Sequence, residues 1–310
     1  MGGMTGGVDG GARVLALVGP TASGKSALAH AVAVIAGDIE IVTVDSMQVY
    51  RGMDIGTATP TPEEQAEVRY HLLGVADPSE DFSLARFLPA ARQALADIDA
   101  RGRRALLVGG TGLYVRALVD GLEVPGLFPE VRASVEADAD TAALHVRLAA
   151  LDPVAAGRME PSNRRRVVRA LEVTLGSGRP FSSFGPGLEA FRPSPVGQVG
   201  LRLPVELLDA RIAARVGWMV AAGFVAEVAD LVARPGGLSR TAHQAVGYRE
   251  VLAHLAGECS LEEAIDGTIA RTRRLARRQV RWFRRDPRIR WIDVDDNAVP
   301  DPSAVLGDWR

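Results

Sequence analysis

Short runs of apolar residues, each followed by a turn, recur along the first third of the chain. Val14–Val18, Ile39–Val44 and Ala105–Val108 are apolar or β-branched almost throughout, as expected of strands buried on both faces. Around these runs, the spacing of apolar residues predicts helices at Ala27–Ala36, Pro60–Val68 and Leu84–Arg101. Because strands alternate with helices of this length, the pattern predicts an α/β fold with a parallel, doubly wound sheet.

The pattern changes beyond about Gly121, where polar or arginine-rich helical stretches follow one another without a convincing strand. These stretches are Glu130–Ala139, Ala142–Leu151, Pro153–Met159 and Ser162–Leu175. A segment rich in Gly, Pro and Ser then leads to another strand at Val199–Leu203. We therefore expect a helical insertion at residues 122–195 between two parts of one core, 13–121 and 196–310. The glycine-rich residues 1–12 are expected to form a flexible tail.

The remainder of the core is predicted to be mainly helical. The expected helices are Val205–Ala222, Gly223–Val232, Gln244–Leu255 and Leu261–Arg285, with an edge strand at Ile289–Val294. Residues at helical spacing predict the buried stripe of the last helix, namely Ile265, Ile269, Thr272, Ala276, Gln279 and Phe283.

Composition narrows the class of protein further. The 310 residues are 47% hydrophobic, which is enough for a large core, and the longest apolar runs are too short to span a membrane. The single cysteine, Cys259, excludes an intramolecular disulfide and a cysteine-rich zinc site. The N-terminus lacks a signal-peptide pattern. We expect a soluble, cytoplasmic protein without membrane contact, and a monomer because no exposed apolar stripe indicates a dimer.

One motif carries most of the chemical information. A complete phosphate-binding loop follows the first predicted strand and consists of Gly19, Pro20, Thr21, Ala22, Ser23, Gly24, Lys25 and Ser26. Lys25 is the only lysine among 36 Lys and Arg residues, and its compact ammonium suits bridging phosphate oxygens better than a planar guanidinium does. The loop predicts binding of a diphosphate or a nucleotide such as ATP, with the Ser26 hydroxyl holding Mg²⁺.

The ends of the other two strands supply candidate acceptor-site residues. Asp45 directly follows the second strand and is a candidate general base, although an aspartate at this point can also simply stabilise a turn. Thr111, after the third strand, can contact phosphate or acceptor, or serve as a turn hydroxyl. Arg211 and Arg215 lie one helical turn apart and can reach the phosphate site or form a surface pair.

Arginines concentrate near the C-terminus. Between Arg271 and Arg290 there are ten arginines and one acid, so this segment carries +9 while the whole chain carries −2. Such asymmetry favours a polyanionic partner, with nucleic acid as the first candidate. Arg273 and Arg277 flank the predicted buried stripe. A second cluster, Arg164 to Arg166 with Arg169, lies in the insertion.

Together these segments closely resemble the tRNA dimethylallyltransferases. The similar stretches are Gly19–Ser26, Val44–Ala58, Leu107–Tyr114, Arg169–Val173, Gly223–Val228, Val246–Glu250 and Thr272–Gln279. They occur in order from about residue 14 to 292, and the set is far more specific than the phosphate loop alone. The chain departs from the family by carrying Arg where lysine is common, as at Arg277, and by a segment at Ser182–Val196 that does not align.

The resemblance implies a P-loop NTPase-like core and a definite reaction. A dimethylallyl group would pass from dimethylallyl diphosphate to N6 of the adenosine beside the tRNA anticodon (position 37), releasing diphosphate. Asp45 would be the base on N6, Thr111 a residue at the reacting centre and Arg215 a diphosphate contact. The insertion would grip the anticodon stem-loop. The implied tRNA contacts, with the two arginines indicated by charge, are Asp45, Ser46, Met47, Gln48, Thr111, Arg132, Arg165, Arg166, Arg169, Arg273 and Arg277.

Two other functions remain open from the residues alone. A phosphate-loop kinase of a small metabolite or nucleoside would account for Lys25, Ser26 and Asp45, but it would leave the arginine-rich helix and the insertion unexplained. A nucleotide-regulated RNA-binding protein without catalysis would bind RNA tightly whether or not Asp45 is present.

Overall fold

A computed structural model describes residues 13–185, 187–295 and 299–309, so the predicted tail at 1–12 lies outside the described residues. The chain divides into two compact units. The first combines the residues up to Val119 with those from Pro193 onward, and the second spans Asp120–Arg192. These boundaries lie a few residues before those expected for the insertion.

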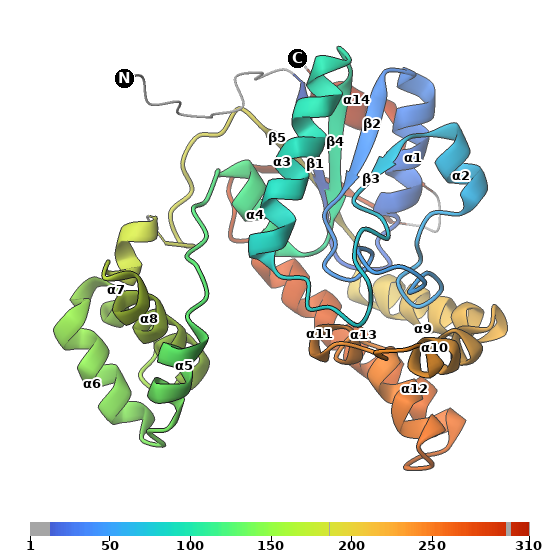
Figure 1. The fold of residues 1–310 in the computed structure, drawn as a ribbon. Coiled ribbons are helices and arrows are strands. Elements are labelled where there is room, and N and C mark those ends of the chain that lie inside the picture. Colours follow the sequence, from blue (N-terminus) through green and yellow to red (C-terminus); the bar gives the residue numbers. More distant parts are fainter. Residues whose placement is uncertain (1–12, 186, 296–298, 310) are drawn as a thin grey trace. The chain divides into compact units, whose positions relative to one another are not determined.

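The first unit is built on a six-stranded parallel sheet (Figure 1), and the predicted fold class is confirmed. The strands are β1 Val14–Val18, β2 Ile39–Thr43, β3 Tyr70–His71, β4 Arg104–Gly109, β5 Gly197–Arg202 and β6 Ile289–Asp293. Their order is β3-β2-β4-β1-β5-β6. β3 was not predicted because two residues are too few to show a periodic pattern. Since β4 lies between β1 and β2, the turns that follow these three strands meet at one edge of the sheet.

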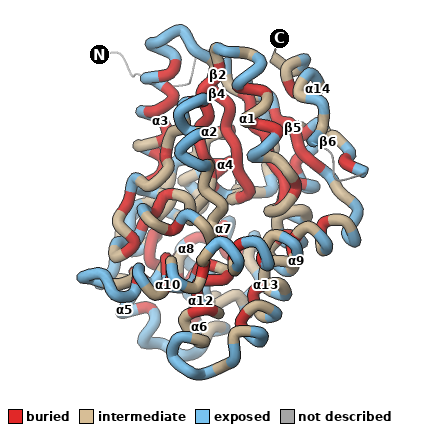
Figure 2. The backbone as a smooth tube through the Cα atoms, turned by 90° about the vertical axis from the view of Figure 1, so that its right-hand side faces the viewer, coloured by how far each residue is buried: buried red, intermediate tan, exposed pale blue. Residues whose placement is uncertain are grey.

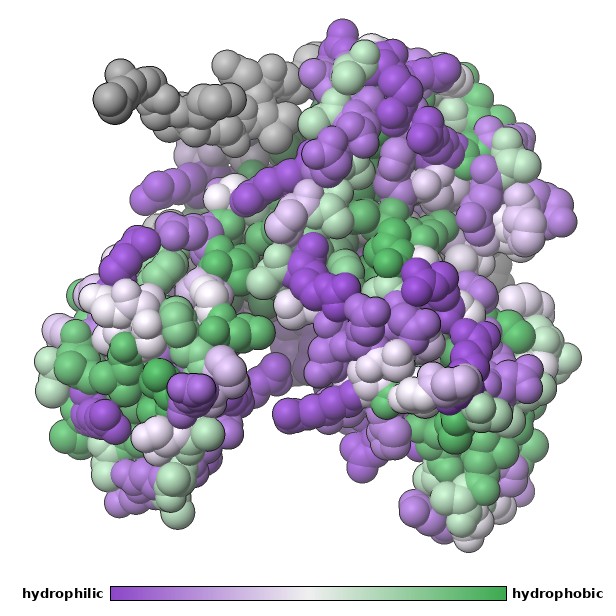
Figure 3. Space-filling model, in the orientation of Figure 1, coloured by the Kyte–Doolittle hydropathy of each residue, from purple (hydrophilic) through white to green (hydrophobic). Residues whose placement is uncertain are grey.

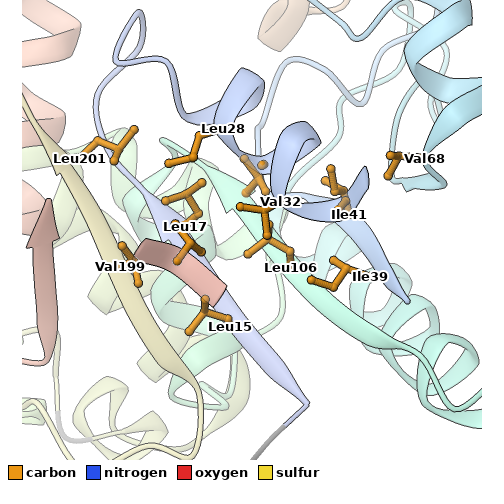
Figure 4. Close-up of a cluster of buried hydrophobic side chains, with 14 of the residues drawn as sticks. Leu15, Leu17, Leu28, Val32, Ile39, Ile41, Val68, Leu106, Val199 and Leu201 are labelled. Atoms are coloured by element: carbon orange, nitrogen blue, oxygen red, sulfur yellow. The ribbon is translucent and has the colours of Figure 1, made fainter. Parts of the chain in front are cut away.

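Helices cover both faces of this sheet, as the α/β pattern predicted. α1 Lys25–Ala36 packs on one face and α3 Leu84–Ala100 on the other (Figure 1). The strands between them are buried along nearly their whole length (Figure 2). Leu15 and Leu17 of β1 meet Leu28 and Val32 of α1 in the main core (Figure 4). This packing fixes the end of β1, and therefore the start of the phosphate loop, on a rigid scaffold.

Two shorter helices complete the N-terminal part of the unit. α2 Pro62–Glu67 begins with a capping box in which Thr61 and Glu64 satisfy each other's backbone N–H groups. α4 Gly112–Val119 directly follows the end of β4 and was not predicted. Its glycine-rich start gave no helical signal, although Tyr114, Val115 and Val119 are buried.

The helices between β5 and β6 gather at the carboxyl end of the sheet (Figure 1). They are α9 Val205–Ala221, α10 Phe224–Ala233, α11 Arg240–His243, α12 Tyr248–Leu255 and α13 Leu261–Phe283, and a short α14 Ser303–Leu306 packs near α1. The single helix predicted at Gln244–Leu255 is wrong at its start. Gly247 has φ +94°, which a helix cannot continue, so α12 begins only at Tyr248.

The buried side of α13 differs in part from the predicted stripe. Ala276 and Phe283 are buried as expected, but Ala264 and Thr268 are buried in place of Ile265 and Ile269, which are half-buried. Thr272 and Gln279 face the cavity described below. The inward side of this helix therefore carries both apolar and polar residues, because it lines a cavity as well as the core.

The second unit is helical and has its own core. Its elements are α5 Pro129–Glu136, α6 Thr141–Leu151, α7 Pro153–Gly157, α8 Arg164–Ser177 and the 3-10 turn Phe181–Phe184. Val135, Leu144, Leu148 and Leu171 are among its buried residues. Apolar side chains also reach its surface (Figure 3), where Val146 is 70% exposed.

Within the described residues, no single helix is both long and apolar enough to cross a lipid bilayer. α9 and α10 meet the length and composition requirement only as a pair, and this pair is bent by 60° at the break between them.

Candidate active site

The phosphate loop adopts a turn that depends on left-handed backbone. Gly19 and Gly24 have φ values of +153° and +90°, and Ala22 reaches +62° without being glycine. Strained backbone of this kind is concentrated at functional sites. The loop ends at the N-terminus of α1, whose free N–H groups and positive dipole end attract anions. The loop is therefore built to hold a phosphate group.

Lys25 is the main titratable group of this loop. Its ammonium donates a hydrogen bond to the Pro20 carbonyl at 3.2 Å. Burial lowers the pKa of Lys25 to about 8; the Asp45 carboxylate opposes this shift and Arg215 adds to it. Lys25, the predicted base Asp45 and Arg215 all line the same cavity.

Asp45 and Thr111 lie on neighbouring turns because β2 and β4 are paired. The Met47 N–H donates to Asp45 Oδ1 at 2.8 Å, and the Ser46 N–H donates to Thr111 Oγ1 at 3.3 Å. Asp45 therefore has the turn role considered above, but it also lines the cavity together with Lys25. One carboxylate oxygen stabilises the turn, and Oδ2 accepts no hydrogen bond from the described residues.

Arg215 and Arg211 reach the phosphate loop from α9. Arg215 donates to Thr21 Oγ1 at 3.4 Å and to the Thr57 carbonyl at 3.3 Å, while Arg211 donates to the Ser23 carbonyl at 3.3 Å. Burial lowers the pKa of Arg215, partly opposed by the Asp45 carboxylate. The two arginines therefore lie at the phosphate site and not in a separate surface pair.

Gln279 of α13 is a site residue that sequence reasoning missed. Its Oε1 accepts the Thr21 N–H at 2.9 Å, and its Nε2 donates to the Gly110 carbonyl at 3.0 Å. A side chain at Gly110 would meet the Gln279 amide at 2.5 Å, so the glycine is needed for this contact. Placing Gln279 in a buried apolar stripe was wrong, because a polar residue at helical spacing looks the same from the sequence whether it faces a core or a cavity.

These groups line one cavity of about 880 Å³ at the carboxyl ends of β1, β4 and β2. Its polar side contains Lys25, Ser26, Asp45, Thr111, Arg215 and Gln279. Apolar residues, among them Val216, Met219 and Phe224, complete the wall. The volume is in the upper part of the range of small-molecule sites, and the mixed lining suits an apolar group joined to an anion.

The predicted RNA-contacting arginines of α13 are engaged within the protein. Arg273 and Arg277 both approach the Asp209 carboxylate, Arg277 at 2.8 Å and Arg273 at 3.6 Å. Arg274, Arg278 and Arg281 share another face of α13 and are exposed; Arg278 also lines the cavity. Among the described residues these three have no carboxylate partner. Arg273 and Arg277 as RNA contacts stay a prediction, and Arg274, Arg278 and Arg281 are further candidates on the same helix.

In the helical unit, too, some of the predicted RNA-contacting arginines pair with a carboxylate and others are exposed. Glu172 is buried and is approached by Arg169 at 2.6 Å and Arg132 at 3.5 Å. Arg165 and Arg166 are exposed at the start of α8. Arg132 and Arg169 therefore support the unit's own structure, whereas the side chains of Arg165 and Arg166 face solvent.

The remaining predicted contacts lie in the turn after β2. Ser46 and Met47 are half-buried and line the cavity. Gln48 also lines it, but its amide donates to the carbonyls of Thr57 and Ala58, both at 3.1 Å. Its donor group is thus used to hold the chain at residues 57–58.

Fold and site together define a phosphate-loop α/β protein whose anion-binding loop and candidate base share a cavity. Comparison with known proteins identifies its family. The family model described as IPP transferase matches residues 48–286, and the model described as isopentenyl transferase matches residues 12–74. This chain belongs to the IPP transferase family.

Individual relatives agree with this assignment. The chain is 52% identical to the tRNA dimethylallyltransferase of Kineococcus radiotolerans, over 93% of this chain and 92% of that protein. The crystal structure of a tRNA isopentenylpyrophosphate transferase from Bacillus halodurans is similar with a TM-score of 0.70 and 37% identity, covering 96% of each chain. A eukaryotic dimethylallyltransferase described as acting on tRNA has a TM-score of 0.75 and 26% identity, covering 91% of this chain and 74% of its own.

Proposed function

We propose that this protein transfers a dimethylallyl group from dimethylallyl diphosphate to N6 of the adenosine beside the anticodon of tRNA. The observation that carries the proposal is the single cavity shared by Lys25, Asp45 and Thr111. A leaving diphosphate and a nucleophilic amine must meet within one enclosed space. Lys25 supplies positive charge there for the diphosphate, and Asp45 supplies a base for the amine. The assignment of tRNA and a dimethylallyl donor as substrates is supported by the names of the relatives.

The phosphate loop holds the diphosphate of the donor. Positive charge converges on the phosphate loop. Lys25 and Arg215 supply full charges, and the loop N–H groups and the α1 N-terminus supply partial charges. As the bond between carbon and oxygen breaks, negative charge develops on the diphosphate, and these groups stabilise it. Lys25 and Arg215 are thus assigned to leaving-group stabilisation.

Magnesium fits this site. The described residues contain no group of three or more His, Cys, Asp or Glu side chains that could hold a metal on their own. Ser26 offers a hydroxyl on the same cavity, and Mg²⁺ commonly combines one or two protein ligands with oxygen atoms of substrate phosphates. When bound, it would neutralise charge on the diphosphate.

Asp45 acts as the general base. In the reaction the N6 nitrogen forms a bond to the first carbon of the dimethylallyl group while that carbon loses its bond to the diphosphate oxygen. The N6 proton passes to Asp45 and the bonding electrons leave with the diphosphate. Because an exocyclic adenine amine is weakly nucleophilic, removing its proton as the bond forms lowers the barrier. Thr111 orients the turn that carries this carboxylate.

The adenosine must leave its stack to reach Asp45. Exposed arginines are suited to hold the RNA backbone while the base is extruded. They are Arg274, Arg278 and Arg281 on the first unit and Arg165 and Arg166 on the helical unit. The helical unit is assigned to the anticodon stem-loop. We place the reaction in the cytoplasm and expect the protein to act as a monomer.

The test is mass spectrometry of nucleosides after incubating the purified protein with tRNA, dimethylallyl diphosphate and Mg²⁺. The proposal expects an adenosine enlarged by one dimethylallyl group and an equal amount of released diphosphate. Unmodified RNA, together with phosphate transfer from ATP to a small acceptor, would overturn it.

A further inference from the structure

Glu227 of α10 makes a set of contacts that the mechanism above does not use. Its Oε2 accepts the N–H groups of Asp54 at 2.9 Å and Ile55 at 2.7 Å. Its Oε1 accepts the Gly56 N–H at 3.2 Å and the Tyr248 hydroxyl at 2.6 Å. Three successive backbone N–H groups that converge on one anion form a nest. Here the anion is a side chain of the protein itself.

The contact anchors the first part of the segment 54–58, whose last part is held by the Gln48 amide. Residues 54–58 form no helix or strand, and Ala58 has φ +50°, which is unfavourable for a residue with a Cβ atom. Gly56 packs so tightly that a Cβ there would lie 2.3 Å from the Phe224 ring and 2.5 Å from the Tyr248 ring. The nest and the two rings together fix the path of residues 54–56.

The segment in turn presents an acceptor to the phosphate site. The Thr57 carbonyl accepts from Arg215 at 3.3 Å and from the Gln48 amide at 3.1 Å. Arg215 also donates to Thr21 of the phosphate loop. A chain of contacts therefore joins the Glu227 carboxylate to the Arg215 guanidinium at the phosphate loop.

We infer that Glu227 is a positioning residue for the diphosphate site: by anchoring residues 54–56, it holds the Thr57 carbonyl where Arg215 needs it. The carboxylate matters because it accepts four hydrogen bonds at once, whereas the amide of a glutamine would turn a donor towards the N–H groups. The inference rests on the proposed function, because it assigns Glu227 to the diphosphate site of that reaction.

The experiment is a calorimetric titration of the full-length protein with inorganic diphosphate and Mg²⁺. Glu227→Gln should weaken diphosphate binding about tenfold, since charge-assisted hydrogen bonds that hold the clamp are lost. Asp230→Asn is the matched control, because Asp230 is exposed on the same helix, and it should bind like the wild type. The KM for tRNA should stay unchanged in Glu227→Gln, which a general loss of structure would not allow.

A double-mutant cycle tests the route through Arg215. In an Arg215→Gln background, Glu227→Gln should have little further effect. An equal loss in both backgrounds, or wild-type affinity in Glu227→Gln, would overturn the inference.

Two further results separate the remaining outcomes. Should Glu227→Gln fail to fold, Tyr248→Phe decides, because it keeps the ring and removes one donor; about a threefold loss is expected, and wild-type affinity would overturn the inference. Failure of the wild type to bind diphosphate would contradict the proposed function, and the inference with it.

Discussion

Gln279 joins the phosphate loop to the end of β4 by binding Thr21 through its carbonyl oxygen and Gly110 through its amide nitrogen. In the proposed reaction Thr21 belongs to the donor site, and Gly110 precedes Thr111 at the acceptor site. A single side chain therefore links the two loops, and we expect it to set the spacing between the leaving group and the reacting centre. Reactions of two bound substrates are sensitive to such spacing, since small displacements cost large factors in rate.

Replacing Gln279 by Glu should separate this positioning role from packing. The carboxylate can still accept the Thr21 N–H but would face the Gly110 carbonyl with a second acceptor. We expect kcat to fall about tenfold or more with only a modest change in unfolding temperature. Steady-state kinetics and thermal unfolding measure the two effects.

Glu262→Gln provides the control, because Glu262 is exposed in the first turn of the same helix. It should leave kcat unchanged. Wild-type kcat in Gln279→Glu would show that the bridge does not set the spacing.

Lys25 predicts a pH dependence for donor binding. Its pKa is lowered to about 8, so the ammonium is charged below this pH and loses its proton as the pH rises through it. A neutral amine no longer attracts diphosphate, and the KM for dimethylallyl diphosphate should therefore rise, approaching about tenfold per pH unit above the pKa. Initial rates at saturating tRNA between about pH 7 and pH 9.5 measure this.

The KM for tRNA serves as the internal comparison, because it does not depend on this amine. A donor KM that stays flat across the same pH range would mean that the Lys25 charge does not contribute to donor binding.

The exposed face of α13 predicts which arginines contact RNA. Replacing Arg281 by Gln should weaken tRNA binding and reduce the slope of log affinity against log salt by roughly 0.7 to 0.9, as loss of one phosphate contact does. Binding of labelled tRNA over a range of salt concentrations measures the slope.

Arg86→Gln is the control. Arg86 lies on α3, pairs with Glu80 at 2.9 Å and does not line the cavity. It should keep the wild-type slope. Equal slopes for Arg281→Gln and Arg86→Gln would remove this face of α13 from the RNA-binding surface.

The core of the fold could be predicted because its strands are continuous apolar runs. β1, β2 and β4 have this pattern, and each is followed by a distinctive turn. β3 and α4 escaped prediction because they depend on tertiary packing: β3 is two residues long, and α4 starts within a glycine-rich segment.

The site residues likewise include some that local sequence indicates and others that depend on tertiary contacts. Asp45 follows the end of a strand and Lys25 lies in a recognisable phosphate-loop motif, so local sequence alone indicates their chemistry. Gln279 and Glu227 act on segments more than 160 residues away in the chain, as in the contacts Thr21–Gln279 and Ile55–Glu227. Local patterns carry no information on such pairings, so only the structure could assign them.

In the proposed reaction Asp45 removes the N6 proton while the phosphate loop holds the leaving diphosphate. The most direct test of this step is a single-turnover measurement of prenyl transfer in preformed complexes of the wild type and Asp45→Asn with labelled donor and tRNA. Asp45→Asn should bind both substrates with near wild-type affinity and transfer the group about 10²- to 10⁴-fold more slowly. Transfer at the wild-type rate by Asp45→Asn would contradict the account.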